Sequence, residues 1–273
     1  MLKQRLLTAV LLIPIIIWLL SLSSQILAGV MSVFVVLGAW EWGRLCGWHH
    51  PLARLAYAMV VGSALLAIYW FWHQSGMMYI LLAACLWWLL ALHWVWRYQQ
   101  GSDLMPKSPL IKGLSGLFIL LPAWVALLVL HQQKPEGGQW VIFLLVLIWV
   151  ADSGAYFVGK RWGQLKLADK ISPGKTWEGV MGALLMSSVV SLGYALLKAM
   201  PLISLLLFIV LCLLTVMASI LGDLLESLFK RQVGLKDSSQ LLPGHGGVLD
   251  RIDSLTSAAP IFVVGLVLLG SML

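Results

Sequence analysis

Acidic and polar side chains follow one another at helical spacing near the end of an apolar stretch. Asp223, Glu226, Ser227 and Lys230 stand at positions i, i+3, i+4 and i+7. On a helix this spacing places all four side chains on one face. A face that carries two carboxylates and an ammonium group can hold a cation and an anion side by side, which a purely structural membrane helix does not need.

A second acidic group follows a glycine turn. Asp250 and Asp253 stand at i and i+3, directly after Gly246 and Gly247. Glycines let backbone amides approach a phosphate closely. Carboxylates that converge at this density repel one another unless a cation lies between them, and Mg²⁺ binds through one or two carboxylates together with substrate phosphates. We therefore expect phosphoryl or nucleotidyl transfer with Mg²⁺, in which positioning and charge neutralisation replace a protein nucleophile.

A third polar segment, residues 172–179, precedes another apolar stretch. It contains Ser172, Lys175 and Thr176, and a helix is expected to begin within it after the Pro-Gly break. Amides at a helix N-terminus beside a lysine can bind an anion. The Gly-Lys-Thr string is not a P-loop, because the first glycine of that pattern is replaced by Asp169. The alternative is a topogenic basic loop with a helix cap at Ser172 or Thr176.

Asp152 lies within a stretch that is otherwise apolar. An acid inside a membrane span is costly and is a candidate functional residue. Its expected partner is Lys160, two turns further along the same helix face. The alternatives are a buried structural ion pair or a polar helix contact, since Gly154 and Gly159 would let another helix approach closely.

Composition indicates what must position these residues. Hydrophobic residues make up 61% of the 273 residues and charged residues 11%, which excludes a water-soluble surface. Stretches of about 20 apolar residues recur, and each can cross a bilayer as a helix. We expect a single all-α membrane domain over 1–273, with N-terminal spans in 1–135 and catalytic spans in 136–273. About nine spans are expected, at 6–22, 26–40, 55–72, 78–96, 112–130, 140–159, 178–198, 202–222 and 256–272.

Basic residues orient these spans. With nine spans, every Lys and Arg except Lys134 and Lys198 falls on one side, together with the N-terminus. Positively charged connections stay in the cytoplasm, so we expect the N-terminus and the three polar segments to face it. The alternative for residues 6–20 is a cleaved signal peptide, but an uncleaved first span is favoured. The net charge of +7 then reflects topology and not nucleic-acid binding. The three cysteines are expected to pack as small hydrophobes.

The segment 227–253, called the signature segment below, resembles the signature of bacterial phosphatidate cytidylyltransferases. Every constrained position of that pattern is filled: Ser227, Phe229, Lys230, Arg231, Lys236, Asp237, Ser239, Leu242, Pro243, His245, Gly246, Gly247, Val248, Asp250, Arg251, Ile252 and Asp253. The strings at 151–156 and 172–177 also resemble that family. The specific likeness covers roughly residues 140–270.

The resemblance implies that phosphatidate and CTP give CDP-diacylglycerol and diphosphate with Mg²⁺, for phospholipid synthesis at the bacterial inner membrane. The implied catalytic residues are Asp223, Asp250, Lys230, Arg231, Lys236, Arg251 and His245. The implied substrate-binding residues are Asp152, Lys160, Ser172, Lys175, Thr176, Ser227, Gly246 and Gly247. The implied metal ligands are Asp223, Asp250 and Asp253. A homodimer is a further expectation from the family.

An ion-coupled transporter is the alternative from another functional class. Asp152 within a span and a helix entry interrupted by Pro and Gly would suit such a carrier. Against it, the polar residues gather at one end of the spans, and no inverted repeat relates the two halves of the sequence.

Overall fold

The computed structural model describes residues 18, 22–71, 74–102, 106–133, 135–241 and 246–270. Within this part of the chain, eight helices are long and apolar enough to cross a membrane. They are α2 (Ser24–Leu45), α3 (Pro51–Trp70), α4 (Gln74–Gln99), α5 (Pro109–Gln132), α6 (Gly137–Trp162), α7 (Trp177–Leu197), α8 (Leu202–Gln232) and α9 (Leu249–Leu268). They confirm eight of the expected spans and the all-α membrane class. The expected first span, 6–22, lies almost wholly outside the described residues, as does the N-terminal tail.

Several helices extend beyond their predicted spans, and the extensions of α2, α8 and α9 carry acidic residues. α8 continues ten residues past the predicted end at 222, and α9 begins seven residues before 256. Asp223 and Lys230 therefore lie on the last turns of α8, and Asp250 lies in the first turn of α9. The predicted ends were wrong because a hydropathy window stops at the first charged residues, whereas the backbone hydrogen bonds of a helix continue beyond them.

The described residues form two compact units, each built from separate stretches of chain. Unit 1 comprises 1–80, 106–142 and 229–253, and unit 2 comprises 81–105, 143–228 and 254–273. The expected single domain remains a prediction.

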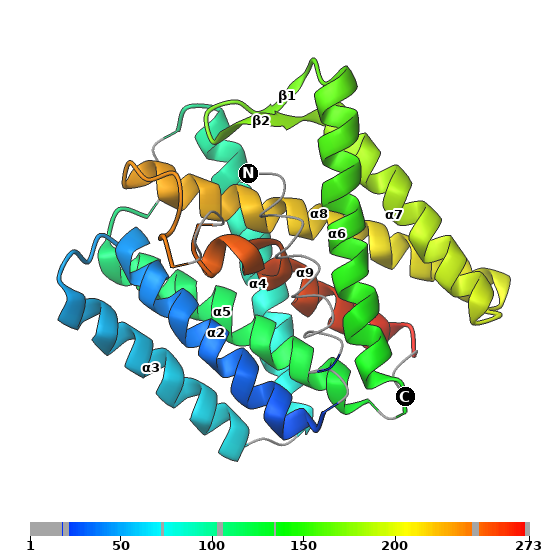
Figure 1. Ribbon diagram of the computed structural model, residues 1–273, viewed down its shortest axis with the longest axis horizontal. Coiled ribbons are helices and arrows are strands. Elements are labelled where there is room, and N and C mark those ends of the chain that lie inside the picture. The colour runs from blue at the N-terminus through cyan, green and yellow to red at the C-terminus, as the bar shows by residue number, and fades with distance from the viewer. Residues whose placement is uncertain are drawn as a thin grey trace. The chain divides into compact units, whose positions relative to one another are not determined.

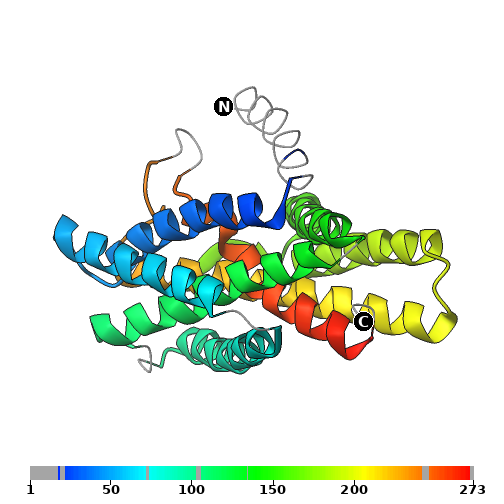
Figure 2. The same ribbon diagram turned by 90° about the horizontal axis from the view of Figure 1, so that it is seen from below.

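Unit 1 is built on α2, α3 and α5, which lie side by side (Figures 1 and 2). α5 is the most buried of the membrane helices, and its glycines admit aromatic side chains from the neighbouring helices. The indole N–H of Trp42 donates to the carbonyl of Lys112 at 2.8 Å, and the hydroxyl of Tyr57 donates to that of Gly113 at 2.8 Å. Trp42 also packs edge-on against Phe229, with ring centroids 5.0 Å apart. This contact joins α2 to the signature segment.

Unit 2 contains α7, most of α6 and α8, and a short hairpin. The ring of Phe143 packs against Tyr194, Phe208 and Phe262, with centroids 4.5, 5.4 and 5.9 Å away. α6 and α7 approach through glycines: a Cβ placed at Gly182 would lie 2.6 Å from the carbonyl oxygen of Gly154. This confirms that small residues on α6 admit a neighbouring helix.

A short hairpin that the sequence did not predict precedes α7. Strands β1 (Lys166–Ala168) and β2 (Ser172–Thr176) pair antiparallel, with Lys166 opposite Thr176 (Figure 1). Pro173 and Gly174 lie in β2, since they favour extended or turn backbone, and the helix expected after them within 172–179 is confirmed. α7 begins at Trp177, and the Thr176 hydroxyl caps it by accepting from the Gly179 amide at 3.2 Å.

Much of the helix surface is apolar. Large hydrophobic side chains are exposed on α3, α4, α7 and α8, including Met59, Leu86, Leu185 and Leu206. A water-soluble chain would not expose apolar residues over whole helix faces, whereas a bilayer provides the matching solvent.

Candidate active site

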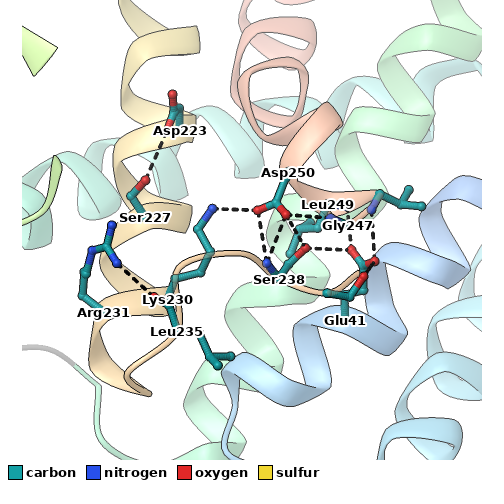
Figure 3. A network of polar contacts seen from close by, with 12 residues as sticks. Glu41, Asp223, Ser227, Lys230, Arg231, Leu235, Ser238, Gly247, Leu249 and Asp250 are labelled. Carbon is teal, nitrogen blue, oxygen red and sulfur yellow. Dashed lines mark hydrogen bonds and ion pairs between the residues drawn. The ribbon is translucent and has the colours of Figure 1, made fainter. Parts of the chain in front are cut away.

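Asp250 is the centre of a hydrogen-bond network in unit 1 (Figure 3). The ammonium of Lys230 lies 2.7 Å from one carboxylate oxygen. The other oxygen accepts from the Gly247 amide at 2.7 Å and from the Ser238 amide at 3.0 Å, and the Ser238 hydroxyl lies 3.0 Å away. Both ends of the salt bridge are about nine-tenths buried. The signature residues therefore meet around one carboxylate, which α9 presents from its first turn.

Gly246 and Gly247 shape the turn in front of Asp250. Gly246 has a φ of +83°, which a residue with a side chain adopts only at a cost. A Cβ at Gly246 would lie 2.6 Å from the Asp250 carboxylate. The expected phosphate contact of these amides remains a prediction. In the structure the Gly247 amide donates a hydrogen bond to the Asp250 carboxylate.

Glu41 joins this network from α2 and was not among the expected site residues. Its carboxylate is fully buried and accepts from the amides of Val248 at 3.0 Å and Leu249 at 2.7 Å. The hydroxyls of Ser238 and Ser239 lie 3.0 and 2.5 Å from it. Figure 3 shows Glu41 opposite Asp250, with Ser238 and Gly247 between them.

The second polar cluster lies in unit 2 and brings together two of the segments identified from the sequence. Lys175 on β2 forms an ion pair with Asp223 on α8 at 2.7 Å. The Ser227 hydroxyl donates to the other Asp223 oxygen at 3.2 Å. The side chain of Asp223 is 35% exposed. Asp152 on α6 lies within electrostatic range of both Asp223 and Lys175. The three motif-bearing elements of unit 2 therefore direct charged groups to one place.

The expected pairing of Asp152 with Lys160 was wrong. The Lys160 ammonium lies 3.3 Å from the Tyr156 hydroxyl and over the Tyr156 ring instead. Sequence spacing predicts which residues share a helix face but not which of them pair. Lys160 contacts the Tyr156 hydroxyl, one turn before it, and not Asp152, two turns before it.

α8 carries members of both clusters on one continuous helix. Asp223 and Ser227 belong to the unit 2 cluster, and Lys230 to the unit 1 network. They lie on one face within two turns, as the spacing predicted. Glu226 is buried on the same helical segment.

The other cations expected from the signature segment are exposed. They are Arg231, Lys236 and Arg251. Arg231 also donates to the carbonyl of Leu235 at 3.1 Å, which closes the turn after α8. Ser172 lies on β2, two residues before Gly174. His245 lies outside the described residues.

The donor set is compatible with a hard cation at Asp223. Among the residues that the structure describes, its oxygens contact one ammonium and one hydroxyl, and no backbone amide donates to them. Within the described ranges, no group of three or more His, Cys, Asp or Glu side chains is arranged to hold a metal ion. Asp223 and Asp250 belong to different units, so a cation shared by them, with Asp253 as a further ligand, remains a prediction.

Comparison with known proteins identifies the family. Residues 3–269 match the cytidylyltransferase family. The chain belongs to that family. A phosphatidate cytidylyltransferase of Pseudomonas aeruginosa is 46% identical over 263 residues, which cover 96% of each chain. One of Haemophilus influenzae is 38% identical over 96% of this chain and 97% of its own. A third, of Brucella suis, is 43% identical over 155 residues, about half of each chain.

The match extends well beyond the motifs of this cytidylyltransferase. It includes α2 and α3, which lie outside the residues 140–270 where the sequence showed a specific likeness. Glu41 lies in this N-terminal part. The signal that could have identified it is an acid directly after an apolar run, in Trp40-Glu41-Trp42, but the predicted span ended at 40 and placed Glu41 in a connection.

Proposed function

We propose that this cytidylyltransferase transfers the cytidylyl group of CTP to phosphatidate, giving CDP-diacylglycerol and diphosphate. The observation that carries the proposal is the 46% identity to a phosphatidate cytidylyltransferase over 96% of both chains. The ion-coupled transporter gains no support from the comparisons.

The bond changes can be assigned to the two substrates. An oxygen of the phosphatidate phosphate forms a bond to the α-phosphorus of CTP. The bond from that phosphorus to the bridging oxygen of the β-phosphate breaks, and diphosphate leaves with the electron pair. No protein nucleophile is needed, so the chain has to bind, orient and neutralise charge.

The exposed cations of the signature segment suit the triphosphate. Arg231, Lys236 and Arg251 are exposed beside the buried Lys230–Asp250 pair. Guanidinium groups match phosphate oxygens in pairs, and lysine provides a compact positive charge. We assign these residues to CTP and departing diphosphate, and Lys160 and Lys175 to the phosphatidate headgroup or the remaining phosphates. His245 is assigned to a phosphate hydrogen bond or to protonation of diphosphate.

Mg²⁺ is proposed as the cofactor. Asp223 would hold it, with Asp250 and Asp253 as the other candidate ligands. When bound, Mg²⁺ neutralises phosphate charge and polarises the phosphorus that is attacked. Lys175 holds Asp223 at 2.7 Å and would be freed for a substrate phosphate when a divalent cation takes its place.

The proposed location rests on the distribution of Lys and Arg residues between the two sides of the membrane spans. We propose a multi-pass protein of the bacterial inner membrane whose active site faces the cytoplasm, where CTP is present. A homodimer is proposed from the family resemblance alone.

The test is turnover by purified protein. Radiolabelled CTP should enter chloroform-soluble lipid only when phosphatidate and Mg²⁺ are both present, and EDTA should abolish the incorporation. Lys198→Gln, at the opposite end of α7 from Lys175, should retain most activity. Incorporation without added phosphatidate would contradict phosphatidate as the acceptor. Full activity in EDTA would contradict Mg²⁺ as the cofactor.

A further inference from the structure

Glu41 is an acid that α2 carries into the interior of unit 1. Its exposed fraction is 0%. Burial of a carboxylate is costly unless hydrogen bonds replace its hydration. α2 is otherwise almost wholly apolar up to this point, so glutamate would not be placed here for packing alone.

Within the described part of the chain, Glu41 has four donors, and all of them lie about 200 residues away in one segment. They are the hydroxyls of Ser238 and Ser239 and the amides of Val248 and Leu249. These residues lie on either side of the glycine turn of the signature segment. A single carboxylate therefore holds both ends of that turn against α2.

Glu41 is also connected to Asp250. The Ser238 hydroxyl lies 3.0 Å from a carboxylate oxygen of each acid, and the Ser238 amide donates to Asp250. Gly247 donates to Asp250, and a Cβ at Gly247 would lie 2.6 Å from both Glu41 oxygens. The position of Asp250 thus depends on Ser238 and Gly247, and both of these are positioned against Glu41.

We infer that Glu41 is a positioning residue for cytidylyl transfer, which orients Asp250 by anchoring Ser238, Ser239 and the start of α9. The inference rests on the proposed function. Glu41 touches no reacting atom in this scheme and acts through the signature segment. Arg44, one turn further along α2, supports the same anchor, since it lies 3.5 Å from the Ser238 carbonyl.

Hydrogen–deuterium exchange tests the anchor without reference to activity. In Glu41→Gln, an amide group replaces one of the acceptor oxygens, so peptides containing Val248 and Leu249 should exchange at least about tenfold faster. Glu178→Gln is the matched control, because the Glu178 carboxylate accepts from the Leu165 amide at 3.1 Å in the other unit. It should accelerate exchange at Leu165 and leave 248–249 unchanged.

Kinetics test the positioning role. Glu41→Gln should lower kcat about 10- to 100-fold and change KM for CTP by less than about threefold. Glu41→Asp restores the charge on a shorter stem and should recover part of kcat. Ser239→Ala should cost little further kcat in the Glu41→Gln background, because both changes remove one contact. Ser115→Ala should keep wild-type kcat, since this buried hydroxyl donates to the Ile111 carbonyl within α5, away from the signature segment.

Three outcomes would overturn the inference. The first is unchanged exchange at 248–249 in Glu41→Gln. The second is faster exchange there with unchanged kcat, which would limit Glu41 to capping α9. The third is faster exchange throughout both units with a lower Tm, which would make the role merely structural. If wild-type protein transfers no cytidylyl group, the proposed function fails, whereas selective exchange at 248–249 would still support the anchor.

Discussion

At the scale of single residues, the two central aspartates have different surroundings. Asp250 is about nine-tenths buried and accepts from a lysine and two amides, and the Ser238 hydroxyl lies 3.0 Å from it. Asp223 is 35% exposed and contacts one lysine and one hydroxyl. Asp250 therefore contributes to local structure as well as to charge, whereas Asp223 remains open to a ligand.

This difference predicts different results for the same substitution. Asp223→Asn should lower kcat at least about 100-fold with little change in Tm, since a partly exposed ion pair adds little stability. Asp250→Asn should remove activity in a folded protein but also cost about 3 kcal/mol, because it leaves Lys230 buried beside a neutral group. Cytidylyl transfer and thermal unfolding in detergent would measure both effects.

Asp169→Asn is the control for these two variants. Asp169 is exposed in the turn between β1 and β2, so activity and Tm should stay at wild-type values. Normal turnover in Asp223→Asn would contradict its role, and an unchanged Tm in Asp250→Asn would show that the network contributes no stability.

Cys46, directly after α2, reports on packing in unit 1. Burial raises the pKa of its thiol to about 12. Because the thiolate is the reactive form, its fraction at pH 8 should be more than about 1000-fold below that of a free cysteine. Iodoacetamide should therefore modify Cys46 only after unfolding in SDS, as measured by mass spectrometry of its peptide. Rapid labelling of the folded protein would show that α2 does not bury this end.

At the scale of elements, the α6–α7 contact positions the unit 2 cluster. Asp152 comes from α6, and Lys175 comes from the strand that leads into α7. The two helices meet at Gly154 and Gly182, where each backbone occupies the space that a side chain would need. The close approach of α6 and α7 therefore depends on the absence of side chains at these two glycines.

Gly182→Ala tests this contact. The added methyl group would lie 2.6 Å from the Gly154 carbonyl and the Val158 side chain, so we expect a loss of about 1–3 kcal/mol and lower activity. Gly193→Ala in the same helix meets nothing within 4 Å and should stabilise the helix by roughly 0.5–1 kcal/mol. Thermal unfolding of both variants measures the effect. Equal Tm values for Gly182→Ala and Gly193→Ala would mean that α6 and α7 can move apart without cost.

At the scale of the whole molecule, sidedness follows from alternation of the helices. The hairpin before α7 and the turn after it lie at opposite ends of one apolar helix of 21 residues. The basic connections fall on the side of the hairpin, and Lys198 falls on the other. From this pattern we expect the hairpin and the other basic connections to face the cytoplasm.

Single cysteines would test this orientation. In a chain with Cys46, Cys85 and Cys212 replaced by Ala, we expect Lys198→Cys to react with a membrane-impermeant maleimide in intact spheroplasts. Gln164→Cys, exposed before β1, should react only after permeabilisation. Labelling of Gln164→Cys from outside would reverse the topology and contradict a cytoplasmic site.

The sequence by itself determined the class, the spans and the main chemistry of this protein. Membrane spans can be predicted because a bilayer demands long apolar helices, and eight of them are confirmed. The signature segment could be identified because its polar residues have no other use at that density. The spacing of Asp223, Ser227 and Lys230 predicted one helix face because helical geometry is local.

Only the tertiary structure decided which distant residues bind one another. The pairing of Lys175 with Asp223 joins segments about 50 residues apart, and Glu41 meets the signature segment across about 200. No periodicity encodes such partners, because they depend on how helices pack and on which buried donors remain to be satisfied. The hairpin at 166–176 was missed for a related reason, since two such short strands are stable only where tertiary contacts support them.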